Sequence, residues 1–172
     1  MRLELTRCVI RDFQAGDLQS LIRHANNRNV SIHLRDRFPY PYLEEHGRQF
    51  LTHVEHAQPV TSWAIEVDGE VAGGIGLMLQ TDVERVSAEI GYWLGEVHWG
   101  KGIVSEALEA VTAESFRLFD LTRIFALPFA DNPGSIRVLE KAGYVREGTM
   151  PRSTIKDGVI RDQLMYGAYR RV

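Results

Sequence analysis

The sequence predicts a mixed α/β (α+β) fold, in which about four helices flank a mostly antiparallel sheet of six to seven strands. Three observations carry this prediction. Alternating apolar residues in the middle of the chain are interrupted by hairpin signals. Four other segments place apolar residues at helical spacing. One of these helical segments stands between two strand patterns, which is typical of a strand-helix-strand unit.

The N-terminal part of the chain predicts one strand and two helices. Residues 2–11 alternate apolar and charged side chains, as a half-buried strand does. Residues 18–25 have helical spacing and follow Asp17, an acidic helix start. A second helix is predicted over residues 43–57. It cannot begin inside Phe38-Pro39-Tyr40-Pro41-Tyr42, because proline lacks an N–H donor and restricts the residue before it.

The middle of the chain predicts an antiparallel meander. Residues 63–67 alternate, Asp68-Gly69 is a hairpin turn signal, and residues 71–79 resume the strand pattern. A looser turn leads to a third strand over residues 86–94. This strand is followed by the glycine-rich turn Gly100-Lys101-Gly102 and then by a helical pattern.

The C-terminal part predicts two helices and three strands, of which the last two strands form a hairpin. The helix after Asn132 has the clearest signals in the chain: an Asn N-cap, Pro133 in the first position and Gly143 just past the end. No repeat or linker interrupts the pattern, so residues 1–172 are expected to form one domain. The elements predicted here are a helix over 103–119, a strand over 123–129, a helix over 133–142, and strands over 144–155 and 159–169, joined by Lys156-Asp157-Gly158.

The composition argues against several function classes. A net charge of -3 gives no general attraction to nucleic acid or to anionic membranes. Cys8 is the single cysteine, so no internal disulfide and no Cys/His zinc spacing is present. The first residues are charged rather than apolar, and no apolar run reaches the roughly 18 residues of a membrane span. We therefore expect a cytoplasmic protein without a metal.

The Gly100-Lys101-Gly102 turn stands where a strand passes into a helix, which is the arrangement of an anion site. Glycines let backbone N–H groups approach a phosphate, and a helix N-terminus adds partial positive charge. A nucleotide P-loop fits poorly, because Gly102 stands where that motif needs Ser or Thr. A dinucleotide site fits poorly as well, because Ser105 stands in place of the third glycine. A glycine-rich turn without a ligand stays open on these residues alone.

Two longer motifs narrow these alternatives. The first runs from Glu89 to Leu94 and on from Trp99 to Ala107, and the second from Asn132 to Tyr144. Together they resemble the coenzyme-binding core of the GCN5-related N-acetyltransferase (GNAT) superfamily. Ile155-Lys156-Asp157-Gly158 and the Phe38–Tyr42 segment are similar to the branch of the ribosomal-protein alanine N-acetyltransferases. The resemblance spans nearly the whole chain, and it implies a single GNAT domain with splayed central strands that uses acetyl-CoA.

The resemblance also implies where coenzyme A binds. The pantetheine arm would lie between the strand that ends at Leu94 and the strand that ends near Ala130, with a kink at Gly91. The pyrophosphate would lie on the glycine turn. Val97 departs from the family, which often has Gln or Arg at this position. The residues expected to bind the coenzyme are Tyr92, Trp93, Leu94, Trp99, Gly100, Lys101, Gly102, Ile103, Val104, Asn132 and Arg137.

For the chemistry, the resemblance implies direct transfer of acetyl to a primary amine, with Glu89 as the base that takes the amine proton. Many members use a tyrosine as the acid that protonates the thiolate, but the matching position here is Leu139. Ser135 is the substitute suggested by the ribosomal-protein branch, and water is the other candidate. Glu89 could instead be an ordinary strand carboxylate, and Ser135 and Asn132 ordinary capping residues.

The acceptor is less defined than the donor. Phe38, Tyr40 and Tyr42 are expected to wall the acceptor pocket. A protein N-terminus and a small amine both stay open as acceptors, and so does a homodimer. No nucleic-acid or membrane partner is expected. A non-catalytic acyl-CoA-binding or sensing module of the same fold is the alternative function, favoured by Leu139 in place of the tyrosine.

Overall fold

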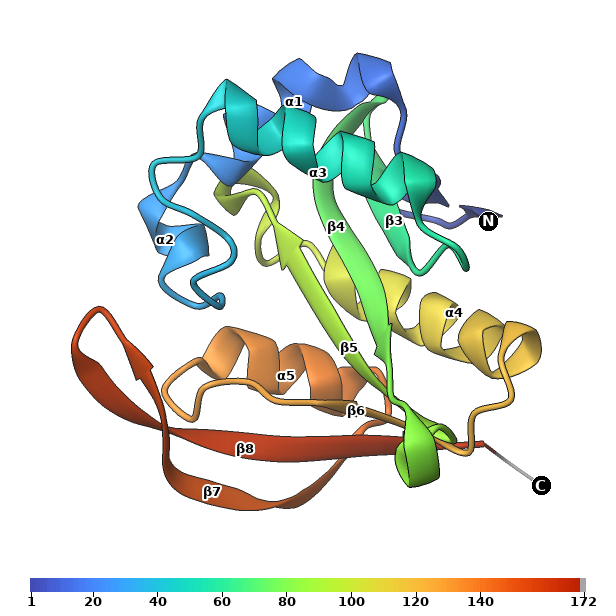
Figure 1. Ribbon diagram of the computed structural model, residues 1–172, viewed down its shortest axis with the longest axis vertical. Helices are drawn as coiled ribbons and strands as arrows, with labels where there is room; N and C mark the ends of the chain where they lie inside the picture. Colours follow the sequence, from blue (N-terminus) through green and yellow to red (C-terminus); the bar gives the residue numbers. More distant parts are fainter. Residues whose placement is uncertain (171–172) are drawn as a thin grey trace. The chain divides into compact units, whose positions relative to one another are not determined.

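A computed structural model describes residues 1–170 of the chain. Eight strands form one sheet in the order β1-β2-β3-β4-β5-β6-β8-β7, and all pairings given with their register are antiparallel except that of β5 with β6. This confirms the predicted fold class. The described residues contain five α-helices and eight strands, more than the sequence predicted. Figure 1 shows the elements: β1 (Arg2–Glu4), β2 (Val9–Arg11), α1 (Leu18–Ala25), α2 (Arg28–Ser31), α3 (Glu44–His56), β3 (Ser62–Val67), β4 (Glu70–Leu79), β5 (Ser87–Leu94), α4 (Ile103–Leu118), β6 (Arg123–Ala126), α5 (Pro133–Lys141), β7 (Val145–Lys156) and β8 (Val159–Tyr169).

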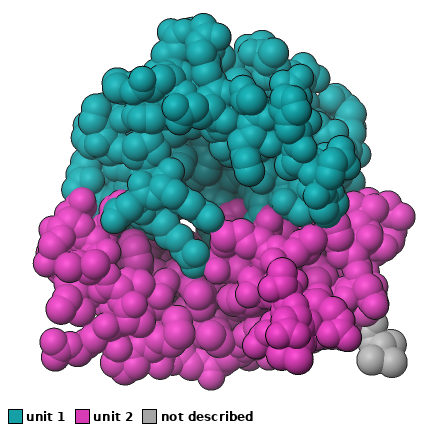
Figure 2. Space-filling model, in the orientation of Figure 1, with its two compact units in different colours: residues 1–76, 92–107 teal, residues 77–91, 108–172 magenta. Residues whose placement is uncertain are grey.

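The chain divides into two compact units, coloured separately in Figure 2. Unit 1 contains Met1–Gly76 and Tyr92–Ala107. Unit 2 contains Leu77–Gly91 and the chain from Leu108 onward. Because β4, β5 and α4 each contribute residues to both units, the units share secondary structure elements rather than a linker.

In unit 1 the prediction of one continuous strand over residues 2–11 is wrong. The chain forms two short antiparallel strands, β1 and β2, in which Glu4 pairs with Val9. Thr6 and Arg7 lie in the turn between them, and the backbone N–H groups of both residues donate to the carboxylate of Glu106. Neither residue is a usual turn former, so the sequence pattern alone gave no sign of the break.

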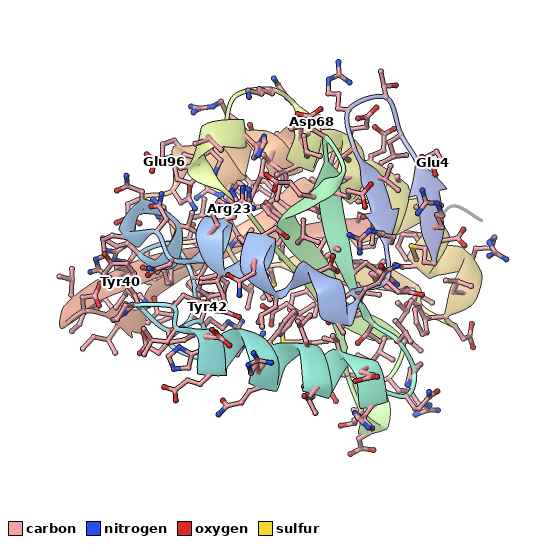
Figure 3. All side chains as sticks on the ribbon, turned by 90° about the horizontal axis from the view of Figure 1, so that it is seen from above. Glu4, Arg23, Tyr40, Tyr42, Asp68 and Glu96 are labelled. Atoms are coloured by element: carbon pink, nitrogen blue, oxygen red, sulfur yellow. The ribbon has the colours of Figure 1, made fainter. Side chains whose placement is uncertain are left out.

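One apolar cluster of unit 1 includes residues of α1 and α3, which run side by side (Figures 1 and 3). Leu21 and Ala25 of α1 are buried together with Tyr42. The β3–β4 hairpin turns at Asp68 and Gly69, with φ of 52° and 85°. These two left-handed residues give the turn that matches the twist of paired strands, as the sequence predicted.

In unit 2 the short strand β6 pairs in parallel with β5 and antiparallel with β8. It ends at Ala126, three residues earlier than predicted, because Pro128 has no N–H for a ladder. The following residues stay beside β8 through other bonds: Leu164 donates to the carbonyl of Pro128, and the Gln163 side chain donates to that of Leu127.

The rest of unit 2 follows the predicted elements closely. Helix α5 is capped by the Asn132 side chain, has Pro133 in its first position, and ends before Gly143, whose φ is 81°. The β7–β8 hairpin turns at Asp157 and Gly158 with φ of 51° and 78°. Among the described residues, no helix is long and apolar enough to cross a bilayer.

Candidate active site

The turn between β5 and α4 is the most distinctive backbone feature of unit 1. The strand ends at Leu94, a short 3-10 turn covers Glu96–His98, and α4 begins at Ile103. Gly100 and Gly102 have φ of 75° and 76°, a conformation that other residues adopt only at a cost. Two left-handed glycines on either side of Lys101 therefore shape the chain just before the helix.

This turn leaves a row of backbone donors unused. Within residues 1–170, no protein group accepts a hydrogen bond from the backbone N–H of residues 100–105. The first hydrogen bond of the helix runs from Glu106 N–H to the Gly102 carbonyl at 3.2 Å. Six consecutive N–H groups at a helix N-terminus suit an anion, because the helix adds partial positive charge at the same place.

Trp99 fixes the approach to the turn. Its indole N–H donates to the carbonyl of Leu94 at 2.7 Å, while 44% of the residue stays exposed. Leu94 is buried, and the N–H of Gly95 donates to the carbonyl of Ala72 in β4. The end of β5 and the glycine turn are thus held together by bonds inside unit 1.

The positive charge at the turn comes from Lys101, which is exposed, and from Arg7, which the sequence analysis missed. A methyl group placed on Gly102 would stand 3.5 Å from Arg7 Nε, so the arginine lies across this glycine. Burial, His24 and Lys101 lower the pKa of His98 from its usual value, which disfavours the charged form of this residue. Arg7 is 95 positions before Gly102 in sequence, so only the fold brings the two together.

The aromatic residues expected at the acceptor pocket fall into two groups. Phe38 contacts Tyr42 and Trp93, with ring centroids 5.1 and 5.3 Å away. Tyr42 is buried in the core of unit 1, and burial raises its pKa to about 12. Tyr40 exposes half its surface, and the guanidinium of Arg28 lies over its ring. Figure 3 labels both tyrosines in the segment before α3.

Unit 2 holds the predicted site residues Glu89, Asn132, Ser135 and Arg137. Glu89 is half-buried on β5, at the last register pair with β6, where it faces Phe125 across the ladder. The Asn132 side chain accepts a hydrogen bond from the Ser135 N–H at 3.1 Å, so these two residues meet at the start of α5. Arg137 is exposed on the same helix. In unit 1, Tyr92 and Val104 are half-buried and Ile103 is buried.

Two positions bear on the expected chemistry. Leu139, which stands where many relatives carry a tyrosine, is fully buried, so this side chain belongs to the core of unit 2. The Cys8 thiol is buried, and its pKa is raised to about 11 by burial and by the nearby Glu106 charge. Such a thiol is protonated at neutral pH and makes a poor nucleophile. Among residues 1–170, no three His, Cys, Asp or Glu side chains are grouped as a metal site.

Comparison with known proteins shows the family to which this chain belongs. Residues 7–145 match the acetyltransferase (GNAT) domain, and the chain belongs to this family. The match includes the β5–α4 turn and all of the Asn132–Tyr144 motif.

Particular relatives differ in what they acetylate. The ribosomal-protein-serine acetyltransferase of Escherichia coli is 35% identical over 94 residues, which cover 54% of this chain and 52% of that protein. The spermidine N(1)-acetyltransferase of Vibrio cholerae is 22% identical over 157 residues, 91% of this chain and 90% of that protein. The chain spans only 52–59% of the length of the first curated relatives it matches.

Among solved structures, the fold is similar to RimL, a ribosomal L7/L12 alpha-N-protein acetyltransferase in complex with coenzyme A. The two share 23% identity with a TM-score of 0.86, and 98% of each chain is covered. At this identity the comparison shows that the two chains share a fold.

Proposed function

We propose that this chain forms one acetyltransferase domain that transfers acetyl from acetyl-CoA directly to a primary amine. The observation that carries the proposal is the row of six unused N–H groups at residues 100–105, in a chain that belongs to the GNAT family. These donors would bind the coenzyme's pyrophosphate, with Lys101 and the start of α4 adding positive charge. Trp99, Ile103 and Val104 contribute to the same turn.

In the proposed chemistry the amine nitrogen forms a bond to the acetyl carbonyl carbon and the C–S bond breaks. Glu89 accepts the proton that the amine loses, directly or through water. Ser135 donates a proton to the leaving thiolate and recovers one from solvent. The end of β5 (Tyr92, Trp93 and Leu94) and Asn132 would contact the pantetheine arm, and Arg137 a phosphate. No covalent enzyme intermediate is proposed, because the Cys8 thiol is buried and protonated.

The amine class follows from the cost of deprotonation. A protein α-amine has an ordinary pKa of about 7.7–8.0, whereas that of a lysine side chain is about 10.4. At pH 7 the neutral form of a lysine therefore costs about 5 kcal/mol, against about 1 kcal/mol for the α-amine. A half-buried carboxylate acting through water suits the smaller cost. We propose a protein N-terminus or a small amine of similar pKa, with Phe38 and Tyr40 beside it and Tyr42 supporting them.

The direct test is thiol release from acetyl-CoA in the presence of a panel of amines: N-terminal peptides, free amino acids, a polyamine and an aminoglycoside. We expect release with at least one α-amine acceptor. Coenzyme binding without release on any amine would instead support the second candidate, a non-catalytic acyl-CoA-binding module. The buried Leu139 in place of a tyrosine is the observation that favours this candidate.

Substitution of the proposed base tests the chemistry separately from binding. We expect Glu89→Gln to lower turnover about 100-fold or more, because general base catalysis contributes on that scale, and to leave the coenzyme Kd within two-fold. The control is Glu109→Gln, which removes the same charge from the exposed surface of α4 and should leave both values unchanged. Equal losses of turnover and coenzyme affinity would make Glu89 a structural residue.

A further inference from the structure

Glu106 is an acid in the first turn of the helix that is proposed to receive a pyrophosphate. An unpaired carboxylate at this place would repel a phosphate. Its two oxygens are occupied, however: one accepts the backbone N–H of Thr6 at 3.0 Å and the other that of Arg7 at 2.9 Å. The side chain is 20% exposed. Glu106 therefore acts first as an anchor for the β1–β2 hairpin.

The anchored turn carries Arg7 to the glycine turn. Arg7 Nη1 lies 3.5 Å from the Glu106 carboxylate, and the stem of the side chain crosses Gly102. The side chain remains 52% exposed, so the contact with Glu106 leaves about half of it open to solvent. Thr6, Arg7, Gly102 and Glu106 all belong to unit 1. Figure 3 shows the same hairpin, with Glu4 of β1 labelled.

We propose that Arg7 is a pyrophosphate-binding residue of the acyl-CoA site and that Glu106 positions it. This inference rests on the proposed function of the glycine turn. The backbone donors of residues 100–105 would hold the phosphate from the helix side, and Arg7 would close over it from the hairpin. A guanidinium presents paired donors that match two phosphate oxygens, which Lys101 as a single ammonium cannot do.

The competing explanation is that the Arg7–Glu106 pair simply joins the hairpin to α4. Half-exposed ion pairs contribute little to stability, so this explanation predicts a small change in melting temperature and no ligand-specific effect. The two explanations therefore differ in whether loss of Arg7 weakens the binding of ligands that carry the pyrophosphate.

The experiment measures Kd by calorimetry for three ligands: coenzyme A, 3′-dephospho-coenzyme A and pantetheine, which lacks the pyrophosphate. We expect Arg7→Ala to weaken coenzyme A and dephospho-coenzyme A about ten-fold each, as loss of a charge-assisted hydrogen bond does. Pantetheine binding should stay within two-fold. Arg7→Lys keeps the charge without the paired donors, so it should weaken the binding of both coenzyme forms about three-fold. The matched control is Arg2→Ala, which removes an exposed arginine at the far end of β1. It should change the Kd of each ligand less than two-fold.

Glu106 is tested through Arg7. Glu106→Gln should lower coenzyme A affinity when Arg7 is present, because the hairpin anchor is weakened. In the Arg7→Ala background the same change should not lower affinity, because only a repulsive charge is then removed. A lower affinity in both backgrounds would overturn the positioning role.

Other outcomes contradict the pyrophosphate contact itself. Unchanged affinity in Arg7→Ala, an equal loss for pantetheine, or a loss confined to coenzyme A with its 3′-phosphate would each overturn it. Failure of the wild-type protein to bind coenzyme A at all would refute the proposed function rather than the role of Arg7.

Discussion

Two helices of this protein begin after a loop with asparagine or glycine signals, yet their N-termini are built in opposite ways. At α5 the Asn132 side chain accepts the Ser135 N–H, Pro133 has no N–H to satisfy, and Ile136 donates to the Asn132 carbonyl. At α4, within residues 1–170, the N–H groups of residues 100–105 have no protein acceptor. One helix start is capped by the asparagine that precedes it, and the other is left open.

The contrast indicates at which helix start a ligand is expected. A capped helix start gains about 1 kcal/mol from its cap and needs nothing further. An uncapped start preceded by two left-handed glycines forgoes that gain, and its donors are oriented for an external anion. We therefore expect changes at the α4 start to affect coenzyme affinity, and changes at the α5 start to affect folding or turnover.

The largest effect should come from the glycine turn. Gly102→Ala places a side chain at φ of 76°, at a cost of about 1–2 kcal/mol, and shifts the donors away from the phosphate. We expect coenzyme A affinity, measured by calorimetry, to fall ten-fold or more. Gly134→Ala is the matched control in the first turn of α5. Gly134 is outside the left-handed region, and the new methyl would meet the Asn132 amide oxygen at an ordinary 3.4 Å, so affinity should change less than two-fold.

The next effect concerns Ser135. Its backbone N–H makes the bond to the Asn132 cap, so Ser135→Ala keeps the cap and removes only the hydroxyl. We expect turnover to fall about ten-fold, less than the usual 10²–10⁴ for general acid–base catalysis, because water can protonate the thiolate. Coenzyme Kd serves as the control and should stay within two-fold. Unchanged turnover in steady-state assays would remove Ser135 from the mechanism.

A smaller effect separates the two roles proposed for Asn132. Asn132→Ala should lower the free energy of unfolding by about 1 kcal/mol, because the cap is lost. Asn132→Ser keeps a capping oxygen, so denaturant unfolding should report near wild-type stability. If Asn132 also contacts the pantetheine, the serine variant will still bind pantetheine more weakly. Equal pantetheine affinity in Asn132→Ser and wild type would leave capping as its only role.

Cys8 gives the smallest effect. A pKa raised to about 11 keeps the thiol protonated up to alkaline pH, and thiolate becomes appreciable only as the pH rises towards that value. We expect Cys8→Ala to keep turnover within two-fold and wild-type Cys8 to resist iodoacetamide at pH 7.5. Rapid alkylation that abolishes turnover, with the alanine variant equally inactive, would reopen a thiol route.

The sequence predicted those parts of the fold and site that depend on local signals. The Asp68-Gly69 and Asp157-Gly158 hairpins and the capped α5 lie where their residues predict, because backbone conformation and capping are decided within a few positions. The split of residues 2–11 into β1 and β2 was not predictable, because the turn at Thr6 and Arg7 depends on a carboxylate about 100 residues away.

The same limit applies to the site. The glycine turn was found from its residue types, but Arg7 has no signal in sequence that associates it with Gly102. The early end of β6 could have been anticipated from Pro128. The burial of Leu139 also has a local signal, the apolar face of its helix. Contacts between residues that are far apart in the sequence could not be predicted.

The central claim is that the open start of α4 binds the pyrophosphate of coenzyme A, and amide NMR tests it most directly. Titration of ¹⁵N-labelled protein with coenzyme A should shift the N–H resonances of residues 100–105 strongly, whereas pantetheine should leave them nearly unchanged. Coenzyme A binding that leaves these six resonances in place would contradict the account.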